Sequence, residues 1–546
     1  MADDEVTVPG ATPVRPAGPH RDLAWGRWGD PADATPLPDA LGPLLEQALG
    51  VRRPGAPVPP LDAARPAPSR LSATARRDLV AIVGDAHLRD DDASRARHAR
   101  GRSTTDLLRV RAGDLADAPD AVVLPAGHDE VLAILRACAG HRVAVVPFGG
   151  GTSVVGGLTP DRDGFAAVVA LDLRRMDALL DVDPTSRTAT LEPGLRGPDA
   201  EALLAPHGLT IGHHPQSFLW ATIGGFAAAR SSGQASAGYG RFDEMVVRLR
   251  VATPTGTLDV GRAPRSAAGP DLRQLVLGSE GAFGVITAVT VAVRPAPAVR
   301  AYDGWRFPSF ATGTDALRSL AQDGPTPTVL RLSDEAETAL NLARPDEIGA
   351  DGAGGCLAIV GHEGDAADVA DRRARTADRL RALGGSPDPD AGPAWEHGRY
   401  RGPYLRDALL DAGALVETLE TTAFWADLPA LYAAVGDALR TTLTDLGTPP
   451  VVLTHVSHVY PTGASLYFTV GCAQADDPVA QWRAAKAAAN AAILATGASI
   501  SHHHGVGVDH RDALAEEIGP LGVAVLRATK AALDPDGILN PGVLVP

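Results

Sequence analysis

The 546-residue chain has few cysteines and no long apolar run. Its three cysteines, Cys138, Cys356 and Cys472, are odd in number and widely spaced, which argues against a disulfide framework and against a clustered metal site. No apolar run approaches the roughly 20 residues that span a bilayer, and the acidic N-terminal residues 1–5 lack the apolar core of a signal peptide. We therefore expect a protein of a reducing, cytoplasmic setting without a transmembrane segment.

Lysine is also scarce, since Lys486 and Lys530 are the only two, and acidic residues outnumber basic ones, which gives a formal net charge of −16. This balance argues against non-specific binding of nucleic acid and against strong attraction to anionic lipid. Apolar residues make up 45% and charged residues 21%, which is ordinary for a soluble globular protein. The length is enough for two or three domains, each with a full core.

What the chain does have is a glycine-rich run after a short apolar stretch, residues 142–146, that is typical of a buried strand. Glycines in this place let the backbone approach a ligand and direct several N–H donors at it, as a pyrophosphate requires. The run is not a Walker loop and matches the nicotinamide-type motif poorly. A mobile surface turn is the alternative. The candidate cofactor-binding residues of this run are Pro147, Phe148, Gly149, Gly150, Gly151, Thr152 and Ser153.

Two further clusters of small and hydroxyl residues follow, and each alone also fits ordinary turn chemistry. Their order after the glycine run favours a crevice lined by backbone, which suits a flat, polar dinucleotide cofactor. The second cluster supplies Gln216, Ser217, Thr222, Gly224, Gly225, Ala229, Arg230, Ser231 and Ser232. The third supplies Glu280, Gly281, Ala282, Phe283, Gly284, Val285 and Ile286.

Strand-like and helix-like segments alternate without the regular spacing of a doubly wound sheet, which predicts an α+β protein. We expect an N-terminal arm with helical parts over 1–118, including a helix within 78–95, and a cofactor-binding domain over 119–296. A Pro-rich stretch at 294–298 then precedes an α+β cap domain over 297–500. We expect residues 501–546 to be a C-terminal segment that packs back near the cofactor and ends in a turn-dense tail at 534–542.

The chain resembles flavoproteins of the vanillyl-alcohol-oxidase type, on the three glycine clusters and their order. Within that type it resembles the alkyldihydroxyacetonephosphate synthases, also called alkylglycerone-phosphate synthases. The segments that carry this resemblance are 25–29, 119–125, 269–271, 330–332, 457–464, 467–468 and the run Ser-His-His-His-Gly-Val-Gly at 501–507. The resemblance implies an FAD-binding domain with FAD between it and a cap. Thr152 stands where some members attach FAD through a histidine, so we expect non-covalent FAD.

The resemblance also implies a reaction with no net redox. Acyl-dihydroxyacetone phosphate exchanges its acyl group for a long-chain fatty alcohol, which makes an ether and releases fatty acid, and FAD traps the substrate rather than carrying electrons. Such chemistry needs a base, a cation for the departing carboxylate and donors for the phosphate. Tyr467 matches the proton-transfer tyrosine of the family. The alternation of 465–469 places it opposite Leu466 and Phe468, so that it can face a cavity, although a structural strand tyrosine is the alternative.

The histidine run matches the family's histidine motif. A phenol has a pKa near 10, so a catalytic Tyr467 needs a cationic or histidine neighbour, which His502, His503 and His504 could supply. If the run is extended, His502 and His504 share a face and His503 points away. We expect no metal here, and expect His504 to lie closest to the chemistry. A metal site and a plain polar loop are the alternatives.

Two arginines match substrate-binding positions of the family. Arg331 lies in an otherwise apolar strand, where a guanidinium is costly unless paired. The resemblance implies that it holds the fatty carboxylate, while a structural ion pair with Asp334 or Glu335 is the alternative. Arg406 aligns less securely with the phosphate-binding arginine, and a solvated helix face is its alternative.

The C-terminal tail, residues 538–545, instead resembles flavin-linked 2-hydroxy-acid dehydrogenases. An FAD-linked oxidase or dehydrogenase of a hydroxy acid or alcohol is therefore the alternative function, and a flavin-binding protein without catalysis is a third. The last residues carry no peroxisomal address. A homodimer is expected from the resemblance alone, and peripheral contact with a membrane is compatible with the lipid substrate, although no stretch indicates it.

Overall fold

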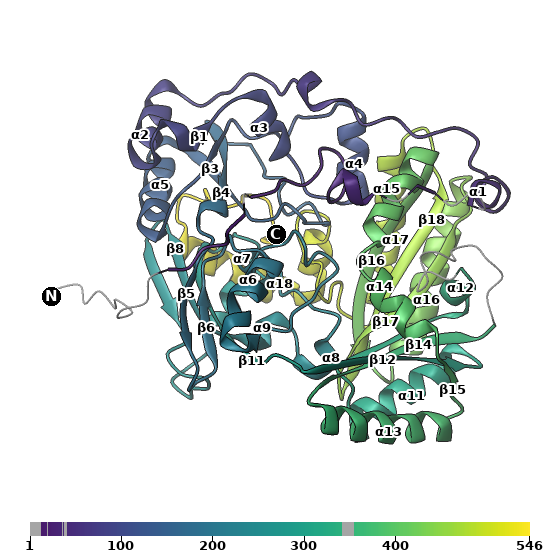
Figure 1. Cartoon of the computed structure of the whole chain (residues 1–546). Coiled ribbons are helices and arrows are strands. Elements are labelled where there is room, and N and C mark those ends of the chain that lie inside the picture. Colours follow the sequence, from purple (N-terminus) through teal and green to yellow (C-terminus); the bar gives the residue numbers. More distant parts are fainter. Residues whose placement is uncertain (1–12, 19, 35, 38–40, 341–353) are drawn as a thin grey trace.

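The computed structural model describes residues 13–18, 20–34, 36–37, 41–340 and 354–546. Figure 1 shows two bodies side by side, one built mainly from residues before 300 and the other from residues 300–500. The C-terminal helix returns to the first body. Among the described residues, no helix is long and apolar enough to cross a membrane.

The first body contains a small, mostly parallel sheet with the strand order β1-β2-β4-β3. Its strands are β1 Leu88–Arg89, β2 Ala121–Val123, β3 Val143–Phe148 and β4 Ala167–Asp172. The two central strands are buried along their whole length, as expected for a parallel sheet covered on both faces. Helices α2 Ala73–Val83 and α5 His128–His141 pack together over this core. Strand β3 ends at the glycine run and so delivers it to the edge of the sheet.

A second, antiparallel sheet completes the first body, with the order β5-β6-β10-β8-β9. Its strands are β5 Leu179–Asp183, β6 Thr188–Leu191, β8 Val246–Thr253, β9 Gly256–Val260 and β10 Val285–Ala292. The helices of this part are α6 Gly197–Leu204, α7 Ile223–Ala228, α8 Ser236–Tyr239, α9 Phe242–Met245 and α10 Arg273–Val276. Strands β7 Leu209–Thr210 and β11 Arg294–Pro295 pair beside it. Together α6, α7 and α9 cover its apolar face.

The second body, the cap, is one antiparallel sheet of seven strands in the order β15-β12-β14-β13-β17-β18-β16. The strands are β12 Val299–Phe307, β13 Val329–Ser333, β14 Cys356–Gly364, β15 Ser386–Asp388, β16 Ala414–Phe424, β17 Val451–Val459 and β18 Gly463–Ala473. One face packs on α11 Phe310–Asp323, α13 Ala366–Ala382, α16 Leu428–Asp445 and α17 Pro478–Ala495. The short helices are α12 Glu335–Ala339, α14 Ala391–Gly398 and α15 Gly402–Ala412.

Both ends of the chain join the two bodies. Helix α1 Leu41–Leu49 packs on the cap beside β18, and α4 Thr104–Arg111 packs against α17, whereas α3 Asp92–Arg97 belongs to the first body (Figure 1). The final helix, α18 Arg511–Leu533, is kinked at Gly519, which has a φ of 69° and precedes a proline.

The expected helix within 78–95 is wrong as one element. Helix α2 ends at Val83, because Gly84 takes a φ of 82° that breaks the helical path. Strand β1 follows, and a new helix, α3, begins after Asp91, whose side chain accepts a hydrogen bond from the backbone N–H of Ser94. A capping residue and a positive-φ glycine therefore divide a segment whose composition suits a helix throughout.

Candidate active site

A cavity of about 680 Å³ lies between the glycine run and the open face of the cap sheet. Side chains of the cap strands alternate between this cavity and the core. Tyr467 lines the cavity, whereas Leu466 and Phe468 are fully buried on the helix-covered side. The prediction that Tyr467 faces a cavity is thus confirmed.

The glycine run and the two later clusters form one wall of the cavity. The predicted cofactor-binding residues that line it are Pro147, Phe148, Gly149, Gly150, Gly151, Thr152, Ser153, Gln216, Ser217, Thr222, Gly224, Gly225, Ala229, Ser231, Ser232, Glu280, Gly281, Gly284 and Ile286. A Cβ at Gly150 would lie 2.1 Å from the backbone oxygen of Trp220, and one at Gly149 would lie 2.5 Å from Thr222 Oγ1. Only glycine leaves this narrow cradle open, which fits the backbone-lined groove that a dinucleotide needs.

Four predicted cofactor residues do not line the cavity. Arg230 points its guanidinium at the backbone oxygens of Leu277 and Gln274 and at Asp243, so it supports the third glycine turn. The others are buried in apolar cores: Ala282 and Phe283 pack against the C-terminal segment, and Val285 packs in the first body. Their part in the site is to position the wall.

The C-terminal tail holds this wall in place. The side-chain amide of Asn540 donates to the backbone oxygens of Gly157, at 3.0 Å, and of Glu280, at 2.7 Å. Its backbone N–H donates to Val145 at the end of the apolar strand, at 2.8 Å. The tail therefore ties two glycine clusters together. Its role is to support the cofactor-binding wall rather than to contact the substrate.

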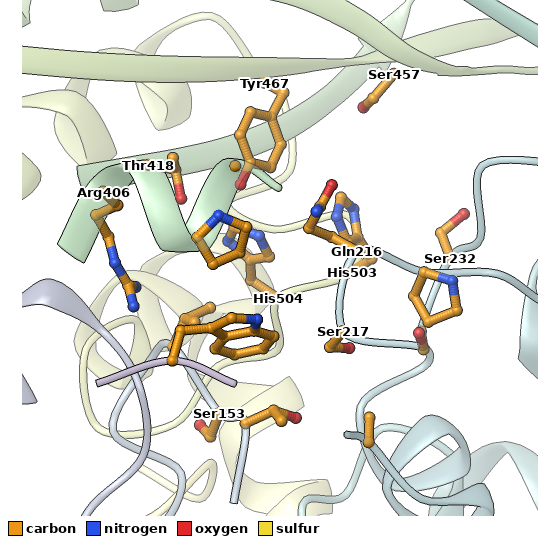
Figure 2. A pocket seen from close by; sticks show the side chains of 18 of the residues that line it. Ser153, Gln216, Ser217, Ser232, Arg406, Thr418, Ser457, Tyr467, His503 and His504 are labelled. Carbon is orange, nitrogen blue, oxygen red and sulfur yellow. The ribbon is translucent and has the colours of Figure 1, made fainter. Parts of the chain in front are cut away.

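The cap supplies the opposite wall, which carries rings and charges (Figure 2). In Figure 2 the hydroxyl end of Tyr467 points toward Thr418 and His504, with Ser153 and Ser217 on the far side of the space. The His455 ring stacks on Tyr467 at a centroid distance of 4.8 Å, and the His504 ring meets Tyr467 edge-on at 5.5 Å. Burial raises the pKa of Tyr467 to about 12. The phenol is therefore protonated, with histidine rings against its face and edge.

The histidine run is a tight loop, so the arrangement of an extended run, with His502 and His504 on one face and His503 pointing away, does not occur. His503 and His504 line the cavity, whereas His502 lies behind them with its Nε2 atom 2.7 Å from the hydroxyl of Tyr460. The cause is Glu420, a fully buried carboxylate on β16. It accepts hydrogen bonds from the backbone N–H groups of all three histidines and from the Ser501 hydroxyl, at 2.6–3.0 Å.

The charges of this loop follow from burial. Burial opposes ionisation of Glu420, but the polar histidine loop around it, with its backbone N–H donors, holds its pKa well below its usual range. Burial lowers the pKa of His504 to about 3 and also lowers those of His502 and His503. The loop therefore presents neutral imidazoles, held by a charged carboxylate.

Arg331 reaches the cavity from β13 and is held from behind by Glu337 of α12. This partner differs from the predicted ones, Asp334 and Glu335. Its Nη2 atom also lies 3.2 Å from His455 Nδ1, and its Nε atom has no partner among the described residues. Burial would raise the pKa of Glu337, yet His455 and Arg331 lower it to about 2. Arg331 thus lines the cavity with the Nη2 side of its guanidinium anchored by Glu337.

Arg406 also lines the cavity, from helix α15 of the cap. Its Nη1 donates to the backbone oxygen of Arg102 at 2.6 Å, and its Nη2 donates to Asp407 at 3.1 Å. Asp407 in turn accepts from the backbone N–H of Trp28 at 2.5 Å. The alternative of a solvated helix face is wrong, because the guanidinium is fixed where the N-terminal segment, the first body and the cap meet.

Three histidines lie close enough together to be considered as ligands of a metal ion. Ring nitrogens of His458, His502 and His503 lie within 4.8 Å of one another. The His458 and His502 rings, however, stack with centroids 4.9 Å apart and planes inclined by only 20°. An imidazole binds a metal in its own ring plane, so two facing rings cannot direct nitrogens at one ion without turning. We keep the prediction of a site without metal.

Sequence reasoning missed Glu420, Glu337 and His455. Each is a charged or polar residue in or beside an apolar strand. The same signal singles out Arg331 and could have indicated these three residues as well. Their importance appears only when the partners, about 80 to 120 positions away in the chain, are brought together.

Comparison with known proteins agrees with this architecture. Residues 119–260 match the FAD binding domain, and residues 296–544 match the C-terminal domain of FAD-linked oxidases. The alkyldihydroxyacetonephosphate synthase of Dictyostelium discoideum is 35% identical over 496 residues, covering 86% of this chain and 80% of the relative. That of Trypanosoma brucei brucei is 33% identical over 491 residues, with the same coverage of 86% and 80%.

A solved structure of alkyldihydroxyacetonephosphate synthase superposes with a TM-score of 0.81 at 30% identity, covering 95% of this chain and 98% of its own. These matches confirm the predicted α+β fold of the vanillyl-alcohol-oxidase type, with an FAD-binding part and a cap. They do not favour the hydroxy-acid dehydrogenase suggested by the tail. The chain belongs to the alkyldihydroxyacetonephosphate synthase family, and its cofactor is FAD.

Proposed function

We propose that the chain exchanges the acyl group of acyl-dihydroxyacetone phosphate for a long-chain fatty alcohol. The C–O bond to the acyl group breaks, an ether C–O bond forms, and the fatty acid leaves, so that no net electrons are transferred. The acid ionises at neutral pH, and one proton is therefore released in each turnover. The observation that carries the proposal is the meeting of Tyr467, the histidine loop and Arg331 on one cavity with the glycine cradle.

FAD is bound without a covalent bond, on the glycine wall. Thr152 lines the cavity at the position where some members of this fold attach the cofactor through a histidine, and its side chain has no comparable nucleophile. When bound, FAD supplies an electrophilic centre that holds the substrate during the exchange. The backbone of residues 149–151 and the clamp by Asn540 orient it.

Proton transfer falls to His504 and Tyr467. A neutral imidazole can accept a proton, and the low pKa of His504 keeps it neutral over the whole physiological range. The protonated Tyr467 hydroxyl can donate to a developing negative charge, because its pKa of about 12 keeps the proton on the oxygen. The two rings are in edge-on contact on one cavity wall, so both groups can act on the same bound substrate.

The departing carboxylate pairs with Arg331. A guanidinium can present two parallel donors to a carboxylate, which an ammonium cannot reproduce. Glu337 already occupies the Nη2 side, so a ligand carboxylate would meet the guanidinium on its cavity-facing side. Arg406 holds the phosphate, supported by its fixed contact with the backbone of Arg102 and by its place on the cavity wall.

The apolar part of the cavity suits an aliphatic chain. Leu405, Leu409 and Leu453 of the cap line it together with side chains of α1. Burying a methylene group is favourable by about 0.8 kcal/mol, so a long chain contributes strongly to binding. We also propose a cytoplasmic setting, supported by three buried free cysteines, a peripheral contact with the membrane that supplies the lipid, and a homodimer.

The deciding experiment is a turnover assay with labelled hexadecanol and palmitoyl-dihydroxyacetone phosphate on the flavin-loaded protein. We expect label in an ether-linked phosphate product, without oxygen or an electron acceptor. A flavin-loaded enzyme that forms no ether but whose flavin is bleached by hydroxy acids would instead be a dehydrogenase. A loaded protein that is inert to both substrate classes would be a binding protein.

A further inference from the structure

A row of hydrogen bonds leads away from the main cavity through the histidine loop. His503 lines the cavity, and its Nδ1 lies 2.9 Å from Nδ1 of His502. The Nε2 of His502 lies 2.7 Å from the hydroxyl of Tyr460. Both imidazoles are neutral, so each has one nitrogen that donates and one that accepts. The three groups therefore form a continuous chain with a direction set by the tautomers.

The far end of this chain reaches a different part of the surface. Tyr460 lines a second cavity of about 310 Å³, between the end of β17, α8 and the neighbouring residues Glu363 and Arg372. Among the described residues, no side chain lines both cavities. Tyr460 and His502 thus stand in the partition that separates the two spaces.

The partition is held rigidly at each member. Glu420 fixes the backbone of His502 and His503, and Arg241 donates to the backbone oxygen of His502 at 3.2 Å. The Tyr460 backbone N–H donates to Gly463 at 2.8 Å, and its carbonyl accepts from the Trp425 indole at 3.0 Å. Such fixed geometry costs no reorganisation when a proton moves.

We propose that His503, His502 and Tyr460 form a proton relay that carries the proton released by the exchange from the main cavity to the second cavity. The inference rests on the proposed function, because that reaction frees one proton inside the main cavity. It also gives His502 a task, since this histidine does not line the main cavity.

At the start, His503 carries its proton on Nδ1 and His502 on Nε2. A proton from the main cavity binds His503 Nε2, and the Nδ1 proton of His503 passes to Nδ1 of His502. The Nε2 proton of His502 passes to the Tyr460 oxygen, which gives its own proton to water in the second cavity. Return of the tautomers to their starting positions resets the relay without further change of charge.

Tyr460→Phe tests the relay, because it removes the hydroxyl and keeps the ring. We expect kcat in dilute buffer to fall on the order of 10-fold to 100-fold, with KM for both substrates and flavin content unchanged. Added imidazole buffer should restore the rate, because a small base that enters the second cavity takes over the transfer. Tyr432→Phe is the matched control: its hydroxyl contacts Asp334 at 3.2 Å and it lines neither cavity, so its rate should not change.

A second variant, His502→Gln, should show the same loss and the same rescue. Combined with Tyr460→Phe it should cause no additional loss, since both changes break one path. Unchanged kcat in both variants, or a loss that no buffer restores, would overturn the relay. A wild-type protein that forms no ether product would overturn the proposed function instead, so the two failures are distinguishable.

Discussion

The two walls of the main cavity are built in opposite ways. The wall of the first body is backbone, glycine and small hydroxyl residues, and a Cβ at Gly149 or Gly150 would collide with neighbouring atoms. The wall of the cap carries Arg331, Tyr467 and the histidine loop, each packed or bonded against another side chain. The first wall binds its ligand through the narrow shape of the backbone groove. The second wall binds its ligand through charged and aromatic side chains.

The difference lies in how each wall is kept in place. On the cap side, buried carboxylates hold the functional groups: Glu337 holds Arg331, Glu420 holds the histidines and Asp407 holds Arg406. On the other side, the narrow space itself and the Asn540 clamp hold the glycine loop. Changes in the cap should therefore impair turnover without releasing FAD, and changes in the glycine wall should do the reverse.

The largest effect should follow from removing the groups that move protons. Tyr467→Phe and His504→Ala should each lower kcat on the order of 100-fold to 10,000-fold, the range typical of general acid–base groups. Bound FAD should remain, because neither side chain belongs to the glycine wall. Ether formation and flavin absorbance measured on one sample would check this, and full activity in either variant would remove that residue from the mechanism.

Glu420→Gln should come next, because it disturbs the loop without touching the substrate. A buried N–H that loses its acceptor costs about 1–3 kcal/mol, so we expect a lower melting temperature and a kcat reduced on the order of 100-fold. Glu192→Gln is the control, since Glu192 is also buried and accepts the backbone N–H of Ala178, and neither residue lines the cavity. It should lower the melting temperature and leave kcat unchanged. Wild-type kcat in Glu420→Gln would show that the loop does not depend on this carboxylate.

Gly150→Ala tests the opposite wall. The added Cβ would lie 2.1 Å from the Trp220 oxygen, and relief of such a clash costs about 1–3 kcal/mol. We expect FAD affinity to fall roughly 10-fold to 100-fold, while excess FAD restores most of kcat. Gly140→Ala, in helix α5 with open space around it, should leave FAD affinity unchanged. A loss of kcat that excess FAD does not restore would mean that the two walls are not separable in this way.

The same contrast explains what could be predicted from the sequence. The glycine wall was recognised almost completely, because its chemistry is local: consecutive small residues after an apolar strand indicate a backbone cradle wherever the chain folds. Tyr467 was placed correctly for the same reason, since strand alternation is local as well.

The cap wall was recognised only in part, because its geometry depends on pairs distant in sequence. The histidine loop takes its shape from Glu420, and Arg331 takes its orientation from Glu337 and His455, which follow from the register of β13, β17, β18 and β16. Periodicity cannot show which carboxylate lies behind which cation. The predicted helix within 78–95 fails for a local reason instead. Gly84 ends one helix and Asp91 caps the next, although the composition of the whole segment favours a helix.

The smallest effect concerns Glu280, a carboxylate of the glycine wall that contacts the histidine loop. It accepts hydrogen bonds from Val506 and Gly507, at 2.8 and 2.9 Å, and burial raises its pKa to about 7. The folded protein therefore binds a proton at this site that the unfolded chain has lost above its ordinary pKa of 4.5. Stability from this group is complete below that value and is lost as the pH rises through about 7.

Glu280→Gln removes this dependence, because the amide does not titrate and its oxygen still accepts from the loop. The melting temperature of the variant minus that of the wild type should rise between pH 5 and pH 8, by roughly 1–3 °C for a protein of this size. Scanning both proteins at the two pH values, with the same FAD content, measures it. A difference that stays constant with pH would mean that Glu280 is ionised throughout. The two walls would then meet across a charged carboxylate rather than a neutral one, and the contrast between them would be weaker at that point.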